Sequence, residues 1–327
     1  MDIGQNFQRI DIVCDQYFQD SVKEQTRCLR GVGTKFEFDD DTSMPGNFRD
    51  DFLHNSQNKN ALNEFLARKI MSLHNGSKNL IVGYKHSVLS NVEEGQLSQA
   101  ITYCTSEEAD QRLVRHAIDA LRDGYKTAVV RTNDTDVLIL LISYIFDTNI
   151  FPDWKVVAAM GKAEESLTCF DIKNIAAGQG HAKSTSFFYA FSGCDTVSSI
   201  FNKGKCKIWD VWRADERFKD ITSVFVELGN LPEVVHDYQI NTLEYFVKKL
   251  YSPAAPKLSE SLAKERLIRF ECSPDNDLRK LPMSRPGLIQ HVKRSCYQAG
   301  YLWRECNENI DLPHPTLWGW CRGATKL

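Results

Sequence analysis

Short apolar runs and apolar positions at helical spacing follow one another along the first part of the chain. Runs rich in β-branched residues predict strands at residues 8–14, 79–84, 100–104 and 126–131. Apolar positions three and four residues apart predict helices at residues 59–73, 107–122, 137–146 and 186–191. Because strands and helices alternate, the pattern predicts an α/β fold with a parallel sheet flanked by helices.

The remainder of the chain has a different pattern. No strand pattern is visible beyond residue 207, and helical spacing recurs at residues 221–228, 241–251, 259–270 and 288–306. A length of 327 residues permits two domains. We therefore expect an α/β core over residues 1–208 and an α-helical C-terminal region over residues 209–327.

Charge and composition limit the class of protein. The chain carries 40 Lys and Arg against 43 Asp and Glu, a net charge of −3, which excludes a polycationic nucleic-acid tail. No signal-peptide pattern is visible, and the longest apolar run, residues 137–146, is about half of what a bilayer needs. We expect an intracellular protein, nuclear or cytoplasmic, with no membrane partner.

Carboxylates gather where the predicted strands end. The acids that follow these strands, or open the helices after them, are Asp15, Glu107, Glu108, Asp110, Asp134 and Asp136, with Asp195 at a later Gly-Cys-Asp corner. Carboxyl ends of parallel strands share one edge of a sheet, so we expect these groups to converge. Converging carboxylates repel one another unless cations neutralise them, and Mg²⁺ and Mn²⁺ prefer such oxygen ligands. Two such ions about 4 Å apart would hold the reacting oxygens of a phosphodiester.

Each of these acids also has a purely structural interpretation. Thr105 and Glu108 fit a capping box, and Asp110 complements the dipole of its helix. Asp134 or Asp136 can cap the helix that starts at residue 137. The capping interpretation weakens when the acids are taken together, because several separate helix starts would all have to use an acid.

Two other enzyme classes share part of the pattern. Asp134-x-Asp136 after a strand is similar to the nucleophile motif of haloacid-dehalogenase-type phosphatases. In that motif the first Asp directly follows the strand, whereas Thr132 and Asn133 intervene here. An Asp-x-Asp glycosyltransferase is the remaining alternative.

The order of the acidic motifs resembles that of a nuclease family. Over about residues 8 to 210 the chain has Ser106-Glu107-Glu108-Ala109-Asp110, Thr132-Asn133-Asp134-Thr135-Asp136 and Gly193-Cys194-Asp195. This series is similar to that of the flap-endonuclease-type 5′-nucleases of the PIN-like superfamily. The resemblance implies a PIN-like sheet and two Mg²⁺ or Mn²⁺ ions, with the ligands Asp15, Glu108, Asp110, Asp134, Asp136 and Asp195. The whole chain also resembles a group of animal proteins that join such a core to a helical tail.

Basic residues complete the predicted site. Members of the family carry a Lys and an Arg on the helix after the strand-end Asp. The resemblance implies that Lys23 and Arg27, on a helix expected at residues 21–30, are catalytic, and that Arg30 binds nucleic acid. At the position of the family's backbone-binding turn the chain has Lys203, Gly204, Lys205 and Lys207, which we expect to contact phosphates. A solvated basic surface is the alternative for both groups.

Two departures from the family leave the activity open. Family members begin with a strand whose terminal Asp binds metal, and since no strand precedes Arg9 we expect that the core lacks this first strand. The backbone-binding turn of the family is rich in glycine, and residues 198–207 keep only Gly204. We expect a metal-dependent nuclease that hydrolyses structured DNA or RNA, DNA more than RNA. The alternative is a catalytically inactive, nuclease-derived protein that binds nucleic acid or acts as a scaffold.

Overall fold

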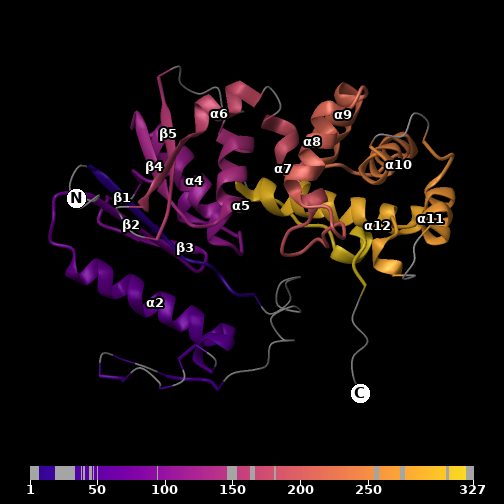
Figure 1. The fold of residues 1–327 in the computed structure, drawn as a ribbon. Coiled ribbons are helices and arrows are strands. Elements are labelled where there is room, and N and C mark those ends of the chain that lie inside the picture. Colours follow the sequence, from indigo (N-terminus) through magenta and orange to yellow (C-terminus); the bar gives the residue numbers. More distant parts are fainter. Residues whose placement is uncertain are drawn as a thin grey trace. The chain divides into compact units, whose positions relative to one another are not determined.

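The structure is a computed structural model that describes residues 7–18, 34–37, 39, 41–43, 46, 48–49, 51–93, 95–145, 153–162, 166–179, 182–253, 258–272, 277–306 and 309–321. Its chain forms two compact units (Figure 1). The first comprises Met1–Ile175 with Glu305–Asn309, and the second comprises Ala176–Arg304 with Ile310–Leu327. This division falls before the boundary expected near residue 208, because the helix over residues 182–192 packs against helices of the second unit.

Two three-stranded sheets form the centre of the first unit. One sheet has the order β1 (Arg9–Val13), β2 (Asn79–Tyr84), β3 (Ser87–Ser90). The other has the order β4 (Thr127–Arg131), β5 (Lys155–Met160), β6 (Thr168–Asp171). In each sheet the first two strands are parallel and the third is antiparallel. The α/β class is therefore confirmed, but the expectation of a wholly parallel sheet is wrong.

Some strands differ from those expected. The strand expected at residues 100–104 is wrong, because a short helix, α3 (Gln99–Thr102), lies there and buries Ile101. The sequence pattern also gave no indication of β3, β5 and β6. β3 has only four residues and follows a tight turn in which Lys85 has a φ of 46°, a conformation usually signalled by Gly or Asn. Without that signal the hairpin is not visible in the sequence.

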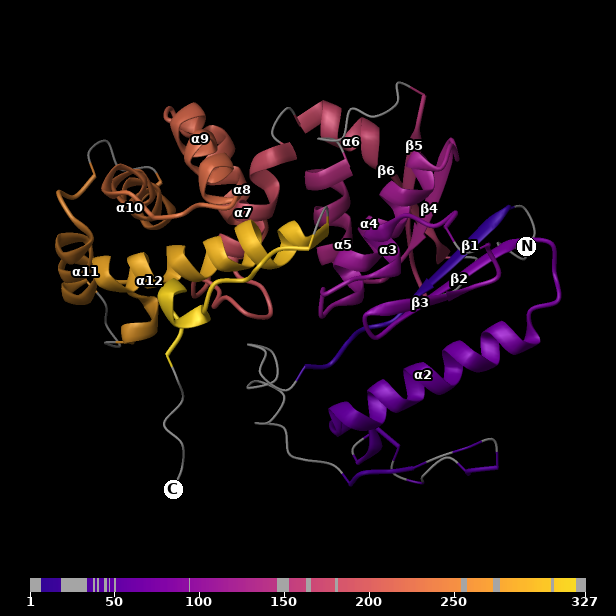
Figure 2. The same cartoon turned by 180° about the vertical axis from the view of Figure 1, so that it is seen from behind.

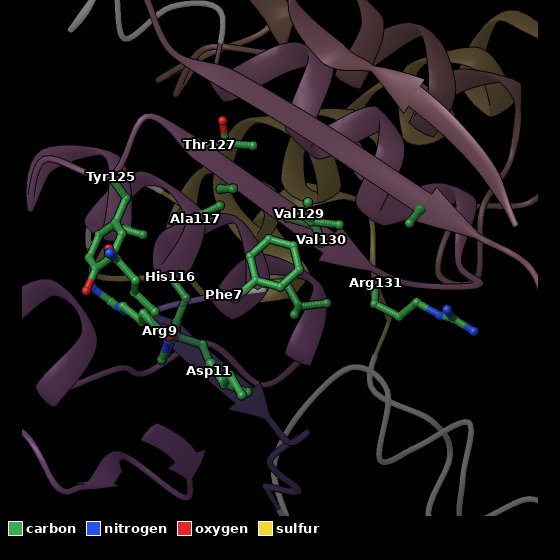
Figure 3. A pocket seen from close by; sticks show the side chains of 16 residues that line it. Phe7, Arg9, Asp11, His116, Ala117, Tyr125, Thr127, Val129, Val130 and Arg131 are labelled. Carbon is green, nitrogen blue, oxygen red and sulfur yellow. Dashed lines mark hydrogen bonds and ion pairs between the residues drawn. The ribbon is translucent and has the colours of Figure 1, made fainter. Parts of the chain in front are cut away.

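Helix α4 (Ala109–Arg122) connects the two sheets and confirms the helix expected at residues 107–122. Its apolar stripe, which includes Val114 and Ile118, is buried. Gly124, with a φ of 93°, follows the helix and lets the chain turn quickly into β4. β4 therefore runs back along α4, and Ala117 of the helix and Val130 of the strand line the same space (Figure 3).

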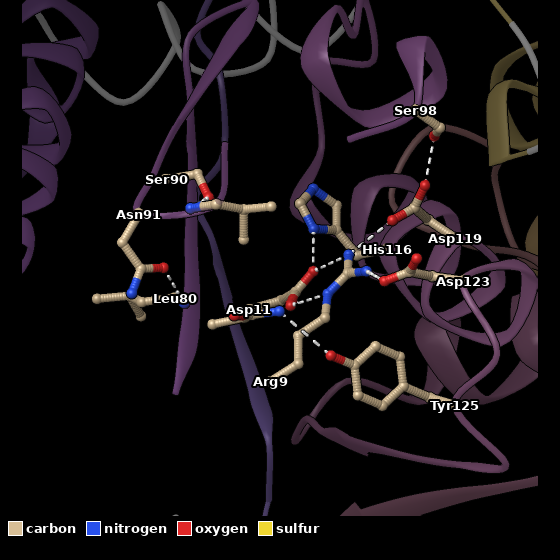
Figure 4. Close-up of polar contacts among 12 residues, drawn as sticks. Arg9, Asp11, Leu80, Ser90, Asn91, Ser98, His116, Asp119, Asp123 and Tyr125 are labelled. Atoms are coloured by element: carbon tan, nitrogen blue, oxygen red, sulfur yellow. Dashed lines mark hydrogen bonds and ion pairs between the residues drawn. The ribbon is translucent and has the colours of Figure 1, made fainter. Parts of the chain in front are cut away.

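β1 also runs antiparallel to α4. In the middle of both elements, Asp11 Oδ2 lies 2.6 Å from His116 Nδ1 (Figure 4). Beyond the end of β1, Asp15 Oδ1 accepts a hydrogen bond of 2.7 Å from the backbone N–H of Ala109, at the start of the helix. Because β1 and β4 are both antiparallel to α4, the four strands β1, β2, β4 and β5 run in one direction. Their carboxyl ends lie toward the start of α4.

A buried polar network holds β1 against α4 (Figure 4). The Arg9 guanidinium donates to Asp11 at 2.8 Å and to Asp119 at 2.7 Å, and lies 3.6 Å from Asp123. Burial alone would raise the pKa of Asp11, but hydrogen bonds from His116 and Arg9 outweigh burial and bring that pKa below its ordinary value. Burial alone would lower the pKa of Arg9, but Asp11 and Asp119 raise it. The contact between β1 and α4 is therefore charged and directional.

The other helices of the first unit cover the strands. α2 (Ser56–Leu73) confirms the helix expected at residues 59–73, and Asn55 caps its start by accepting from the backbone N–H of Gln57 at 2.9 Å. α2 packs on β2 through a small cluster that consists of Ala67, Leu80 and Val82. The helix expected at 137–146 consists of α5 (Thr135–Leu140) and a π-helix (Leu141–Ile145). α6 (Ile172–Gln179) follows β6.

The described residues of the second unit form helices and connecting loops, as expected for the C-terminal region (Figure 2). The main helices are α7 (Ala182–Ser192), α8 (Lys205–Ala214), α9 (Phe218–Leu228), α10 (Asp237–Tyr251), α11 (Leu262–Glu271) and α12 (Arg285–Cys296). Aromatic rings with centroids 5.1 to 6.3 Å apart fill the core, namely Phe187, Phe188, Phe191, Trp212, Phe225 and Phe246. Across the described part of the chain, every helix is too short or too polar to cross a bilayer.

Candidate functional site

Hydrogen bonds fix the end of β1 to the start of α4. In addition to the bond between Asp15 and the Ala109 N–H, the backbone N–H of Gln16 donates to the carbonyl oxygen of Glu107 at 2.7 Å. The buried side-chain amide of Gln16 donates to two more carbonyl oxygens in the segment before α4. These bonds place Asp15 at the helix start that carries two of the predicted ligands.

The capping box expected from Thr105 and Glu108 is wrong. Within the described segment 95–145, Glu108 itself occupies the N-cap position of α4, and its side chain makes no capping hydrogen bond. Thr105 Oγ1 instead donates to Glu305 at 3.2 Å and to Asn309 at 3.1 Å. Asp15 binds the first helical N–H from 94 positions earlier in the chain. A local sequence signal cannot reveal a cap that comes from another strand.

Asp134 and Asp136 lie at the end of β4. Asp134 is the N-cap residue of α5, and its Oδ1 accepts from the backbone N–H of Asp136 at 2.9 Å. The structural interpretation of Asp134 is therefore confirmed. Asp134 is exposed and Asp136 is half-buried. β4 belongs to the other sheet but runs in the same direction as β1, so these two acids and Asp15 follow strand ends that point the same way.

The predicted ligands are carboxylate oxygens, which a hard divalent cation prefers, but the structure does not bring them together into one group. Five predicted oxygen ligands follow parallel strands or open α4 and α5, namely Asp15, Glu108, Asp110, Asp134 and Asp136. Among the described residues, however, no three His, Cys, Asp or Glu side chains are grouped closely enough to hold a metal ion. Two of the carboxylates already accept backbone N–H groups. The described side chains provide suitable ligands but no formed metal centre.

The Gly-Cys-Asp corner belongs to the second unit. Gly193 has a φ of 109°, and a Cβ there would lie 2.6 Å from the Cα of Ser199, so only glycine fits. The N–H of Cys194 donates to the carbonyl oxygen of Val197 at 2.9 Å and closes the loop. Asp195 is exposed, and the next helix begins only at Lys205. Its proposed role beside the other acids stays a prediction.

Lys23, Arg27 and Arg30 lie outside the described residues, as does the helix expected at residues 21–30. Their predicted roles at the reacting phosphate and in nucleic-acid binding stay predictions.

The predicted phosphate-binding turn leads into α8. Gly204 is the N-cap residue of that helix. Lys203 Nζ lies 4.6 Å from the centre of the Tyr251 ring, and Lys205 Nζ lies 4.1 Å from the centre of the Tyr189 ring. Lys205 also donates to the carbonyl oxygen of Gly193. The side chains of Lys203 and Lys205 therefore make contacts within the second unit.

Cations nevertheless gather at this turn. Burial lowers the pKa of Lys203, and repulsion from Lys207 and Arg269 lowers that pKa further. Lys207 is exposed. Sequence reasoning did not single out Arg269, because it lies on α11 and reaches this turn only through the packing of the helices.

Sequence reasoning also missed Glu305. This carboxyl group is 3% exposed and accepts a hydrogen bond from Thr105, from which it is separated by 200 positions. Burial raises the pKa of Glu305 to about 7, and the charge of Glu107 also raises it, whereas the hydrogen bond from Thr105 and the charge of Arg115 lower it. Glu305, which contacts the segment before α4 through Thr105, is therefore neutral below about pH 7 and charged above it. No local pattern marks it, because its burial comes from a distant segment.

Comparisons of the chain with protein-family models, with curated proteins and with solved structures find no match. The fold therefore defines the chain as an α/β unit joined to a helical unit. The resemblance of its motifs to flap-endonuclease-type nucleases stays a prediction.

Proposed function

We propose that this protein is a divalent-metal-dependent nuclease with a PIN-like core that hydrolyses phosphodiesters of structured DNA or RNA. The observation that carries the proposal is the bond of 2.7 Å between Asp15 and the N–H of Ala109. It joins the end of β1 to the helix start that carries Glu108 and Asp110. Asp134 and Asp136 follow β4, a strand of the other sheet that runs in the same direction as β1.

Electrostatics supports a cation near these acids. Carboxylates brought together at these strand ends would repel one another, and the repulsion is stronger near the low-dielectric protein than in water. A hard divalent ion would relieve the repulsion and would attract the phosphate oxygens of a substrate. Glu108, Asp110, Asp134 and Asp136 would hold Mg²⁺ or Mn²⁺ through their oxygens. The exposed side chain of Lys207 would contact the nucleic-acid backbone.

Cleavage assays test the proposal directly. The full chain is incubated with fluorescent single-stranded, double-stranded and flap DNA, and with RNA of the same sequences, in Mg²⁺, Mn²⁺ or EDTA. We expect cleavage that EDTA abolishes and that Asp110→Asn and Asp134→Asn each reduce by about 100-fold or more, since even outer-shell partners of metal sites are worth about 10- to 100-fold. Asp311→Asn, at an exposed position of the second unit, is the matched control and should leave the rate unchanged. No cleavage of any substrate, or equal rates for Asp134→Asn and the wild type, would contradict the proposal.

The second candidate is a protein that binds nucleic acid without cleaving it. It is favoured by one specific observation, namely that the described acidic side chains form no group of three ligands. Fluorescence anisotropy in EDTA distinguishes the two. Binding that needs no metal, is unchanged in Asp136→Asn and weakens in Lys207→Gln, together with the absence of cleavage, would support this candidate.

A further inference from the structure

The connection between α2 and β2 carries the only Asn-Gly pair of the sequence, Asn75-Gly76. α2 ends at Leu73 and β2 begins at Asn79, so residues 74–78 join the helix to the sheet (Figure 1). Both members of the pair are exposed, and both lie outside the helix and the strand. Solvent therefore reaches the side chain of Asn75 and the backbone of Gly76.

Hydrogen bonds fix the ends of this connection but not its middle. His74 Nε2 lies 3.0 Å from the carbonyl oxygen of Lys78, which also accepts from the side chain of Asn91 at 2.8 Å. Among the residues that the structure describes, neither the side-chain amide of Asn75 nor the backbone N–H of Gly76 has a hydrogen-bond partner. The two groups are therefore free to react with each other.

An Asn that precedes a Gly can lose its side-chain amide without an enzyme. The backbone nitrogen of the Gly gives its proton to a solvent base and attacks the side-chain carbonyl carbon, and ammonia leaves as the bond to the amide nitrogen breaks. Water then opens the resulting cyclic imide at either carbonyl, so the product is aspartate or isoaspartate. Gly favours the attack because it has no Cβ beside the attacking nitrogen and its backbone adopts more conformations.

Asp123 and Gly124 show the opposite arrangement. An Asp-Gly pair can form the same cyclic imide by losing water. Here, however, the N–H of Gly124 donates to the carbonyl oxygen of Leu121 at 3.2 Å, and Asp123 Oδ2 lies 3.6 Å from Arg9 Nη1. Both reacting groups are engaged, so this pair is an internal control within the same chain.

We propose that Asn75 is a site of spontaneous deamidation, which converts its side-chain amide to a carboxylate with water as the only co-reactant. The modification adds a negative charge just beyond the last residue of α2, at the negative end of the helix dipole. The last turn of α2 contains no basic residue that would offset this charge, so the modification should destabilise that turn. The proposal is independent of the proposed nuclease function.

Ageing the full chain at pH 8 in heavy-oxygen water tests the proposal. Mass spectrometry of a digest made in ordinary water should find a heavy oxygen atom in place of the amide at Asn75, with aspartate and isoaspartate both present, and no label at Asp123. The conversion should be faster at pH 8 than at pH 6, because the attacking nitrogen must lose its proton. Absence of label at Asn75, or equal labelling of Asn75 and Asp123, would overturn the proposal.

Two matched variants test the role of the glycine. Gly76→Ala should slow the labelling of Asn75 by at least about tenfold, because a Cβ disturbs the approach of the nitrogen to the carbonyl carbon. This Cβ would lie 3.3 Å from His74 Cε1, a contact that a small rotation of the ring relieves, so the variant should fold. Ser77→Ala, at the next position, should leave the rate unchanged. Equal rates for Gly76→Ala and the wild type would contradict the proposed reaction.

Hydrogen exchange tests the effect on α2. Amides in the last turn of α2 should exchange about two- to fivefold faster in Asn75→Asp than in freshly prepared wild type, because the added charge opposes the helix dipole. Asn75→Gln keeps the amide and should exchange like the wild type. Equal exchange in Asn75→Asp and the wild type would refute the effect on the helix.

Discussion

The two units differ in a prominent feature of their interiors. In the first, β1 is held to α4 by buried charged groups, with Arg9 between Asp11 and Asp119 (Figure 4). In the second, rings such as Phe225 and Phe246 fill the core. Polar contacts are directional and fix where each strand end lies, whereas apolar burial is nondirectional and proportional to area. In the unit that carries the predicted acidic ligands, the position of β1 on α4 therefore depends on charge as well as on apolar burial.

The largest expected effect comes from the aromatic core. Phe225 is fully buried and contacts five other rings of the core. Phe225→Ala should lower the free energy of unfolding of the second unit by about 3 to 5 kcal/mol, because it removes apolar burial and leaves a cavity. Urea denaturation followed by tryptophan fluorescence measures this effect, since all six tryptophans except Trp154 belong to the second unit. Phe270→Ala, at an exposed position of α11, is the control, and a similar loss there would contradict the argument.

The next effect is the pH dependence of stability that Glu305 gives to the first unit. The pKa of Glu305 is about 7 in the folded protein and near 4.5 when unfolded. Between these values the folded state holds a proton that the unfolded state has lost, so stability falls as pH rises through this window, by about 3 kcal/mol in total. Glu305→Gln should be more stable than the wild type at pH 8 and about equal at pH 4.5. Urea denaturation by circular dichroism at a series of pH values tests this, and an unchanged pH profile would refute it.

The second unit should respond to pH with the opposite sign. Burial lowers the pKa of His291 to about 4, although its Nε2 lies 2.8 Å from the carbonyl oxygen of Phe191. Between pH 4 and the ordinary value of 6.5, the unfolded state binds the proton and the folded state does not. Stability of this unit should therefore fall by about 3 kcal/mol as pH decreases through that window. Tryptophan fluorescence should detect the loss, and His291→Gln should remove most of it.

The smallest expected effect compares two helix caps. Asn55 caps α2 in the first unit and Ser284 caps α12 in the second. Asn55→Ala and Ser284→Ala should each cost about 1 kcal/mol. Circular dichroism should detect both losses, whereas tryptophan fluorescence should detect mainly the second. If each variant shifts both signals equally, the two units unfold as one cooperative body and the comparison between them fails.

Much of the local structure is visible in the sequence. The apolar run at residues 79–84 is β2 with the same bounds, because a buried strand needs a continuous run of apolar side chains. The stripe that includes Val114 and Ile118 predicts α4 for a similar reason. The strand predicted at residues 100–104 was wrong. The apolar content of this segment is typical of a short strand, but the chain forms a helix there after Ser98.

The candidate site could be predicted only in part. Placing Asp15, Asp110 and Asp134 at strand ends and helix starts follows from the pattern alone. The sequence could not show that Asp15 caps α4, since its partner lies 94 positions away. It also could not show Glu305 behind that helix start, because burial of a lone acid leaves no periodic signal.

By itself, the amino-acid sequence determined most of the helices, the strands β1, β2 and β4, the helical character of the C-terminal region and the position of each acid within its own segment, because these depend on neighbours within a few residues. Only the tertiary structure decided that β1 and β4 belong to two separate sheets with a groove between them, and that Glu305 loses its contact with water. Those features depend on contacts between residues far apart in the chain, whose free energy is set by packing and burial and not by local pattern.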